Sequence, residues 1–388
     1  PKSEIMLVEY LFSTSDGDFP AGQAELALPF KITPTQNHPS LTLKDYFDAV
    51  RTFVLKDQGK PLEGVLRDKL GLQPCFEDIE KIRIRSEKHG VLYHLISLEI
   101  FLQGPPVKFS VSTAISKKGK EWLNHEFSVL NRLHRRYHFP YLPRPYFSGE
   151  VPCHLEKTKE TLTMMLSEWF EGYHEWHFSK DPDVGDHKIC IWDTLHGNRF
   201  TSQEQSFSIL RQISRILTLY YEPEKFCQIY PWHHAAGDFI IKIIEDRVDV
   251  KLTTARKYES FMEVFSTEKA NPVIAILYYF MNLTIRIRLD RLDGVGEIYW
   301  AEDFSVTAAT TGFFDAVNRM AMAGRLPVDH GKVLLFLFKS FDLDELKKLF
   351  DSLLLLYHQD DPVEFETIRG NLKNHVGLFH RTLQEFSL

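Results

Sequence analysis

Residues 230–242, YPWHHAAGDFIIK, concentrate side chains that can do chemistry. His233 and His234 can act as bases or bind a metal near neutral pH, and Asp238 can bind a hard cation. The glycine before the aspartate favours a tight turn, and the apolar β-branched run after it indicates a strand. Three interpretations are open at this point: a packed polar turn, a binding or catalytic loop, and a metal site.

A metal site here would have to combine His233, His234 and Asp238. Neighbouring side chains in extended backbone diverge, so adjacent histidines rarely bind one ion together. A third or fourth protein ligand is also needed, and the sequence does not place one. The packed turn and the cleft loop are therefore favoured over the metal site.

The composition is that of an ordinary globular protein, with 44% hydrophobic and 26% charged residues among 388. A chain of this length suits two domains or one two-lobed domain. The net charge of −7 argues against general nucleic-acid binding. Four scattered cysteines without a CxxC pair predict neither disulfides nor a thiolate zinc site, and favour a cytoplasmic protein. The most apolar run, residues 272–285, is shorter than the ~20 residues of a membrane span, and we expect a buried helix.

The first half of the chain predicts one helix and then strands. The helix covers residues 43–55 and begins after Thr42 as its N-cap. From residue 79 apolar and charged residues alternate, which is typical of half-buried strands. We expect an antiparallel meander at residues 79–85, 91–102 and 107–116, a loop at residues 138–151, and a strand at residues 161–170.

A second helix is predicted over residues 121–136, between these strands. Leu123, Phe127, Leu130 and Leu133 form one apolar stripe at helical spacing, and Glu126 lies next to it. The basic cluster at residues 131–139 is interpreted as the solvated end of this helix, where cations are favourable.

The second half of the chain is predicted to be mainly helical. The opening motif leads into a short hairpin over about residues 239–254. Helices are expected at residues 206–221, 272–291, 307–323, 332–341, 343–358 and 362–386.

This order of elements resembles the protein-kinase-like fold over about residues 79–327. Three antiparallel strands, a helix bearing a glutamate and two more strands precede a helical half that contains a loop and a hairpin. The pattern is most similar to the aminoglycoside- and choline-phosphotransferase branch. The resemblance implies an α+β protein of two lobes: an N-terminal extension at 1–78, an antiparallel-sheet lobe at 79–175 and a mainly helical lobe at 176–388.

The resemblance also implies a catalytic loop. In this family an aspartate accepts the substrate proton, and an asparagine five residues later holds Mg²⁺. The family motif resembles HGDxxxGN, and PWHHAAGD places His233 at the base position and Asp238 at the metal position. The second metal carboxylate follows the hairpin, where this chain has Thr253 or Thr254. Asp249 in the hairpin is the remaining metal candidate, although its position also suits a solvent-facing side chain.

The nucleotide contacts are implied in the same way. A strand lysine and a helix glutamate hold the phosphates in the family, and Lys108 with Glu126 is the matching pair. The segment that connects the lobes lines the adenine pocket, which assigns Glu168 and Phe170 to cofactor binding. The turn at residues 86–90, SEKHG, stands where a glycine-rich loop would cover the phosphates, and it has one glycine.

Two functions follow from the resemblance. The first is a degenerate, pseudokinase-like protein that binds a nucleotide or another small ligand in the cleft between its lobes. The second is an active small-molecule phosphotransferase that uses ATP and Mg²⁺, with Asp238 on the metal and His233 near the acceptor hydroxyl. A metal-dependent hydrolase using His233, His234 and Asp238 is a third alternative. No nucleic-acid or membrane partner is expected.

Overall fold

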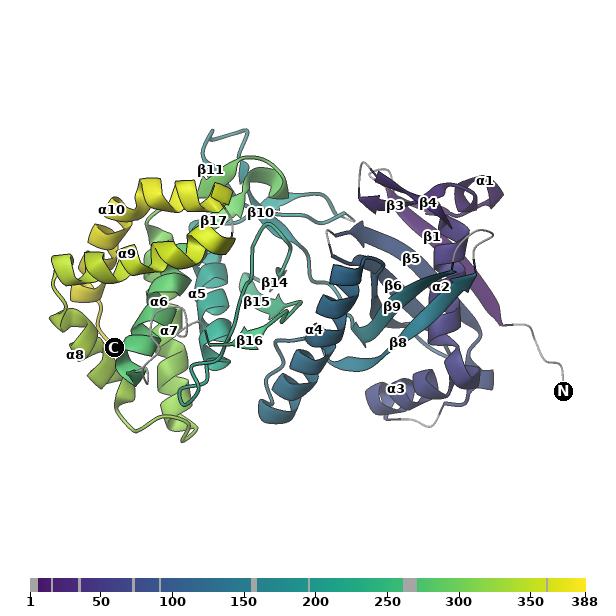
Figure 1. The fold of residues 1–388 in the computed structure, drawn as a ribbon, viewed down its shortest axis with the longest axis horizontal. Helices are drawn as coiled ribbons and strands as arrows, with labels where there is room; N and C mark the ends of the chain where they lie inside the picture. Colours follow the sequence, from purple (N-terminus) through teal and green to yellow (C-terminus); the bar gives the residue numbers. More distant parts are fainter. Residues whose placement is uncertain are drawn as a thin grey trace. The chain divides into compact units, whose positions relative to one another are not determined.

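The protein is a mixed α+β chain, described here from a computed structural model (Figure 1). The structure describes residues 6–14, 17–33, 36–71, 74–90, 92–154, 159–194, 196–260, 271–360 and 362–388. The chain divides into two compact units. Unit 1 comprises residues 1–138 and 143–171, and unit 2 comprises residues 139–142 and 172–388.

Unit 1 is built on a seven-stranded sheet in the order β2-β1-β5-β6-β7-β9-β8. The predicted meander is confirmed: β5 (Lys81–His89), β6 (His94–Phe101) and β7 (Val107–Ala114) are antiparallel neighbours. Strand β9 (Lys159–Glu168) lies beside β7, and β8 (Pro145–His154) lies beside β9. Three antiparallel strands, a helix and two further strands are therefore present in the predicted order, consistent with a kinase-like fold.

The N-terminal residues of unit 1 extend this sheet and fill its core. Strand β1 (Leu7–Thr14) is parallel to β5, and β2 (Gly17–Pro20) pairs with β1. Two short elements, α1 (Gln23–Leu26) and the hairpin of β3 (Pro29–Thr33) and β4 (Gln36–Thr42), precede α2 (Leu43–Val54). Helix α2 is the predicted helix, and its Thr42 cap forms a capping box with Asp45. Its apolar face shares one core with β5, β6, β7 and β9, and α3 (Lys60–Leu70) follows it.

Helix α4 (Lys117–Arg136) begins four residues earlier than predicted, because Ser116 caps it. The predicted stripe was partly wrong. Glu126 lies within the buried face together with Leu123, Leu130 and Leu133, whereas Phe127 is only partly buried at its edge. Helix α4 packs against β7, β8 and β9.

Two predicted irregular segments of unit 1 are strands. The loop expected at residues 138–151 contains most of β8, because prolines at residues 145 and 152 are accommodated in an edge strand. The turn expected at residues 86–90 is largely the end of β5, with a register shift near Ser86. The turn itself is shorter, and the Gly90 N–H donates to the Tyr93 carbonyl at 2.9 Å.

Unit 2 begins with small sheets that the sequence did not predict. Strands β10 (Trp176–Lys180), β11 (His187–Ile191) and β12 (Arg199–Phe200) form one antiparallel sheet. Helix α5 (Gln203–Leu219) follows, and then β13 (Gln228–Ile229) pairs with β16 (Tyr258–Glu259). The predicted hairpin is confirmed as β14 (Phe239–Ile244) and β15 (Arg247–Leu252).

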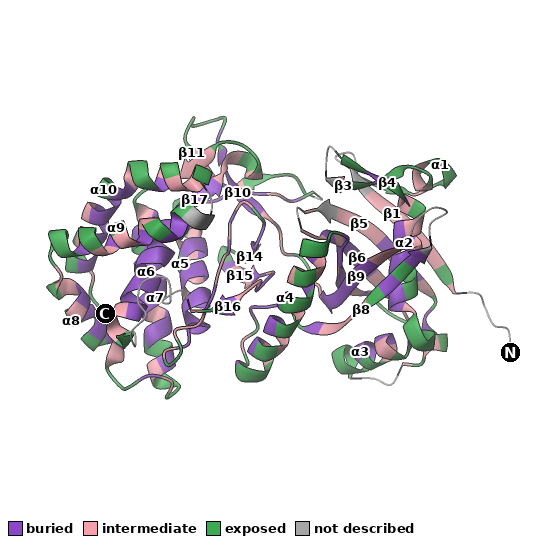
Figure 2. Ribbon diagram, viewed as in Figure 1, coloured by how far each residue is buried: buried purple, intermediate pink, exposed green. Residues whose placement is uncertain are grey.

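The rest of unit 2 is mainly helical, as predicted. Helix α6 (Pro272–Arg286) is buried on nearly every side (Figure 2), which explains its continuous apolar sequence. It ends earlier than predicted, because residues 289–291 form β17 (Leu289–Arg291) and pair with β18 (Ile298–Trp300). Helices α7 (Phe304–Met322), α8 (His330–Ser340), α9 (Leu343–Asp360) and α10 (Pro362–Glu385) follow. Within the described ranges, no helix is both long and apolar enough to span a membrane.

Close contact between α5 and α7 depends on a glycine. A Cβ atom at Gly312 would lie 2.0 Å from the Arg211 carbonyl oxygen, and a backbone atom cannot move aside cheaply. We predict that Gly312→Ala lowers the free energy of unfolding by about 1–3 kcal/mol or more, as overpacked cores do.

Denaturant unfolding measures this effect, and Gly370→Ala is the matched control. Gly370 lies on α10, and an added Cβ would have no neighbour within 4 Å. Alanine should stabilise that helix by roughly 0.5–1 kcal/mol. Equal effects at the two positions would contradict the packing argument.

Candidate functional site

The loop between β13 and β14 is held by the carboxylate of Asp238. Its side chain is 1% exposed, and the guanidinium of Arg256 binds it in a bidentate pair, Nη1 to Oδ2 and Nη2 to Oδ1, both at 2.7 Å. The His233 N–H donates to Oδ2 at 2.9 Å. Both carboxylate oxygens therefore accept charge-assisted hydrogen bonds, which are the strong class. This network brings the predicted base and the predicted metal ligand together through the backbone of His233.

The position that follows the hairpin is occupied by a threonine. The Thr253 hydroxyl lies 3.2 Å from the Asp238 carbonyl oxygen, and the Thr253 N–H donates to the same oxygen at 2.7 Å. Asp249 on β15 is about half exposed; the Tyr173 hydroxyl donates to it, and the Lys251 Nζ lies 3.5 Å away. Across the described part of the chain, no group of three or more His, Cys, Asp or Glu side chains could hold a metal ion.

The imidazole of His233 is engaged by two charged residues. Its Nδ1 lies 2.6 Å from Nη2 of Arg286, the last residue of α6, and 3.4 Å from Oε1 of Glu364 on α10. Arg286 and Glu364 also form a short ion pair with each other. Burial raises the pKa of the Glu364 carboxyl, but the positive charge of Arg286 outweighs it, and that pKa is lowered to about 2.

His234 faces the interior of unit 2. It is 2% exposed between the rings of Trp176 and Trp232, and its Nε2 donates to the Ile287 carbonyl at 3.2 Å. Burial lowers the pKa of His234 to about 4, so the ring is neutral near neutral pH. Its contacts are those of a packed core histidine.

The predicted nucleotide contacts of unit 1 lie on β7 and α4. The Lys108 Nζ is 3.6 Å from Oε1 of Glu99 on the neighbouring strand and 4.7 Å from the centre of the Trp169 ring. Glu126 is 3% exposed on the inner face of α4. Lys108 therefore has a close carboxylate on its own sheet, and Glu126 lies on the buried face of α4.

The other two predicted cofactor residues, Glu168 and Phe170, lie at the end of β9 and just after it. The Ser110 hydroxyl of β7 is 3.2 Å from the Glu168 carbonyl oxygen and 2.8 Å from the Ser167 hydroxyl. The Glu168 carboxylate accepts from the Arg144 N–H at 3.3 Å, and Phe170 is partly buried. The backbone at the end of β9 is thus hydrogen-bonded to the middle of β7.

Three charged residues at the loop were missed by sequence reasoning. Arg256 stands two residues beyond Thr254, and its proximity to the hairpin end was the one available signal. Arg286 and Glu364 lie 53 and 131 positions from His233, on α6 and α10. Nothing local in the sequence indicates that these helices reach the loop.

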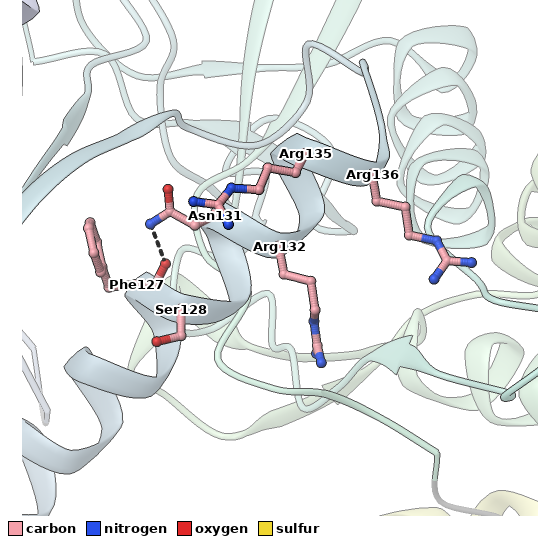
Figure 3. A pocket seen from close by; sticks show the side chains of 6 residues that line it. All are labelled: Phe127, Ser128, Asn131, Arg132, Arg135 and Arg136. Atoms are coloured by element: carbon pink, nitrogen blue, oxygen red, sulfur yellow. Dashed lines mark hydrogen bonds between the residues drawn. The ribbon is translucent and has the colours of Figure 1, made fainter.

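A basic hollow lies on the C-terminal half of α4 (Figure 3). Its volume is about 740 Å³, and the Asn131 amide on its wall donates to the Phe127 carbonyl at 2.9 Å. The lining residues are Phe127, Ser128, Asn131, Arg132, Arg135 and Arg136. The predicted solvated, basic helix end is therefore concave rather than flat, and Arg132, Arg135 and Arg136 are exposed there.

Comparisons with known proteins identify no family for this chain. No protein-family model and no curated protein sequence matches this chain. Among solved structures, the crystal structure of Rad53 1-466 in complex with AMP-PNP shares 16% sequence identity, with a TM-score of 0.30. The match covers 60% of this chain and 52% of that one, about half of its length. The assignment to a kinase-like fold therefore rests on the strand and helix order described above.

We predict that breaking the Asp238–Arg256 pair strongly destabilises the protein. Arg256→Met leaves a buried carboxylate without its cation, which should cost about 3–5 kcal/mol in the free energy of unfolding. The double variant Asp238→Leu/Arg256→Met should recover much of the loss, because it leaves no buried charge. Urea denaturation measures both.

Asp249→Asn is the control for this pair. The Asp249 side chain is 48% exposed beside Lys251, and removal of such a surface charge should change stability by less than about 1 kcal/mol. A cost below 1 kcal/mol for Arg256→Met would show that the pair does not hold the loop.

The buried histidines predict a loss of stability in mild acid. The pKa of His234 is lowered to about 4, and burial beside Arg288 lowers that of His375 to about 3. Below pH 6.5 these histidines become protonated in the unfolded chain but stay neutral in the folded chain. The free energy of unfolding therefore falls as the pH drops from about 6.5 to 4. Each histidine contributes up to about 1.4 kcal/mol per pH unit in this window.

Unfolding at a series of pH values tests this linkage. His234→Gln keeps an N–H donor for the Ile287 carbonyl but does not titrate, so the slope between pH 6.5 and 4 should become shallower. The same change at the exposed His138 should keep the wild-type slope, because His234 is intact there. An unchanged slope in His234→Gln would refute the assignment.

Proposed function

We propose that the protein is a degenerate kinase-like protein that binds a nucleotide or another small ligand and does not carry out efficient phosphoryl transfer. The observation that carries this proposal is the bidentate pair of Arg256 with Asp238. The residue at the family's metal position already has a cation bound to both of its oxygens.

Kinase chemistry depends on positioned metal ions rather than on covalent chemistry by the protein. The second metal carboxylate of the family corresponds here to Thr253 or Thr254, and neither side chain carries a charge. Asp249 is about half exposed, with Tyr173 and Lys251 as its partners. The side chains at these positions do not fit Mg²⁺ in their present arrangement.

The base position supports the same proposal. A neutral imidazole has one acceptor nitrogen, and the Nδ1 of His233 accepts from Arg286, which is always protonated. The proton of the neutral ring is then on Nε2. A general base needs a free acceptor nitrogen within reach of the substrate hydroxyl, and this ring offers none in that state.

The differences from the family at the metal and base positions do not involve the residues assigned to nucleotide binding. The kinase-like arrangement of unit 1, with Lys108 on β7 and Glu126 buried on α4, supports a nucleotide as the ligand. ATP is the natural candidate, and the proposal expects its binding not to depend on Mg²⁺.

Thermal unfolding with ATP, ADP and GTP, each with Mg²⁺ or with EDTA, tests this proposal. A nucleotide that binds only the folded state raises the melting temperature, and at 100 times Kd it adds about 2.7 kcal/mol of stability. We expect a shift of equal size in Mg²⁺ and EDTA, and a smaller one in Lys108→Gln.

Two results would contradict the proposal. If no nucleotide raises the melting temperature, the proposed nucleotide binding is wrong. A shift that requires Mg²⁺, together with transfer of phosphate to a small hydroxyl compound, would establish the active phosphotransferase instead. Lys332→Gln, on α8, serves as the charge-matched control for Lys108→Gln, because the Lys332 side chain is 75% exposed beside Asp329.

A further inference from the structure

A hollow of about 580 Å³ in unit 2 lies apart from the loop of Asp238. Its volume falls within the range of small-molecule sites, roughly 300–1,000 Å³. One wall is a face of α10, and the others come from Arg288 between α6 and β17, from the end of β18 and from Asp303 at the start of α7. The lining residues are Arg288, Trp300, Asp303, Asn371, Lys373, Asn374, Gly377, Leu378 and Arg381.

A buried arginine lies in the wall of this hollow. Arg288 is 5% exposed, and its guanidinium carbon is 4.9 Å from the centre of the Trp300 ring. Its Nε donates to the Ala301 carbonyl at 2.8 Å, its Nη2 donates to Asp303 at 3.1 Å, and its Nη1 lies 3.5 Å from Nδ1 of His375. The counter-ion Asp303 is 71% exposed, so it compensates the buried charge only weakly. Arg288 is thus a fixed, pre-oriented cation.

The α10 wall adds polar groups that have no partner of their own. The side chains of Lys373, Asn374 and Arg381 make no hydrogen bond or ion pair with any residue that the structure describes. With Arg288 they supply three cations against the single carboxylate of Asp303, which leaves a net two positive charges in a chain of net charge −7. Uncompensated cations at a concave surface attract anionic ligands.

Gly377 leaves space in the same wall of the hollow, because it has no side chain. It lies in the middle of α10, where glycine costs roughly 0.5–1 kcal/mol relative to alanine. No atom of the described chain lies within 4 Å of the Cβ that another residue would have there. Packing inside the protein therefore does not require this glycine, whereas it leaves open space at the hollow.

We propose that this hollow binds a small phosphorylated molecule. A phosphate monoester carries a charge of about −1.5 to −2 at pH 7 and offers three acceptor oxygens, which matches the two net positive charges and the planar fork of Arg288. The Trp300 ring and the Leu378 side chain provide apolar surface for the carbon part of the ligand. The site uses no residue of the proposed nucleotide-binding function.

Titration with glycerol phosphate and with inorganic phosphate, followed by calorimetry and thermal unfolding, tests the proposal. Glycerol and sodium chloride at matched ionic strength are the neutral and ionic controls. We expect saturable binding of glycerol phosphate, weaker binding of phosphate, and at least a tenfold loss of affinity in Lys373→Gln/Arg381→Gln. An effect that chloride reproduces at equal ionic strength would overturn the proposal.

Two glycines of α10 provide a matched pair that separates binding from folding. Gly377→Leu fills the hollow, and Gly370→Leu places the same side chain on α10 outside it; neither Cβ has a neighbour within 4 Å. Both variants should fold with unchanged or higher melting temperatures. Only Gly377→Leu should lose glycerol phosphate binding while keeping the nucleotide shift. Retention of binding in Gly377→Leu, or no binding by the unmodified protein, would refute the site.

Discussion

The contact between Asp238 and Arg256 constrains the centre of unit 2 more than any other polar interaction described above. Water is almost excluded from the carboxylate, so its charge must be compensated inside the protein. The guanidinium does this from the segment that follows β15, while the His233 N–H binds from the segment before β14. The segments on both sides of the hairpin are thereby bound to one side chain.

The other ionisable groups at this loop are also either paired with an opposite charge or buried in a neutral form. Arg286 and Glu364 neutralise each other beneath His233, and that histidine accepts a hydrogen bond from the arginine. His234 is buried among aromatic rings in its neutral form. Each ionisable group of the loop is thus matched by a partner in the fold or kept neutral by burial. The matched charges therefore account for the stability of the loop.

The two anion-attracting hollows differ in how they are built. The one on α4 is formed by exposed arginines at a helix C-terminus, where cations are favourable without any ligand. The one beside α10 contains a buried arginine fixed by a carbonyl and an aromatic ring, and a glycine that leaves space. A buried, oriented cation has already lost its hydration, so an anion that reaches it gains more than at the exposed helix end.

The sequence by itself determined the elements whose cause is local. Alternation of apolar and charged residues predicted β5, β6 and β7, and the Thr42 cap with its apolar face predicted α2. The element order was enough to indicate a kinase-like α+β fold. Strand β8 was missed because its prolines are typical of loops, and only its position at the sheet edge makes them acceptable.

Tertiary structure alone decided the partners of the candidate site residues. Asp238 meets Arg256 across a hairpin, and His233 meets Arg286 and Glu364 across 53 and 131 positions of the chain. A carboxylate in a motif can bind a metal, a cation of the protein or water, and its sequence is the same in each case. Which one it binds depends on burial and on side chains brought in by distant helices, because the energy of a charge is set by its surroundings in space.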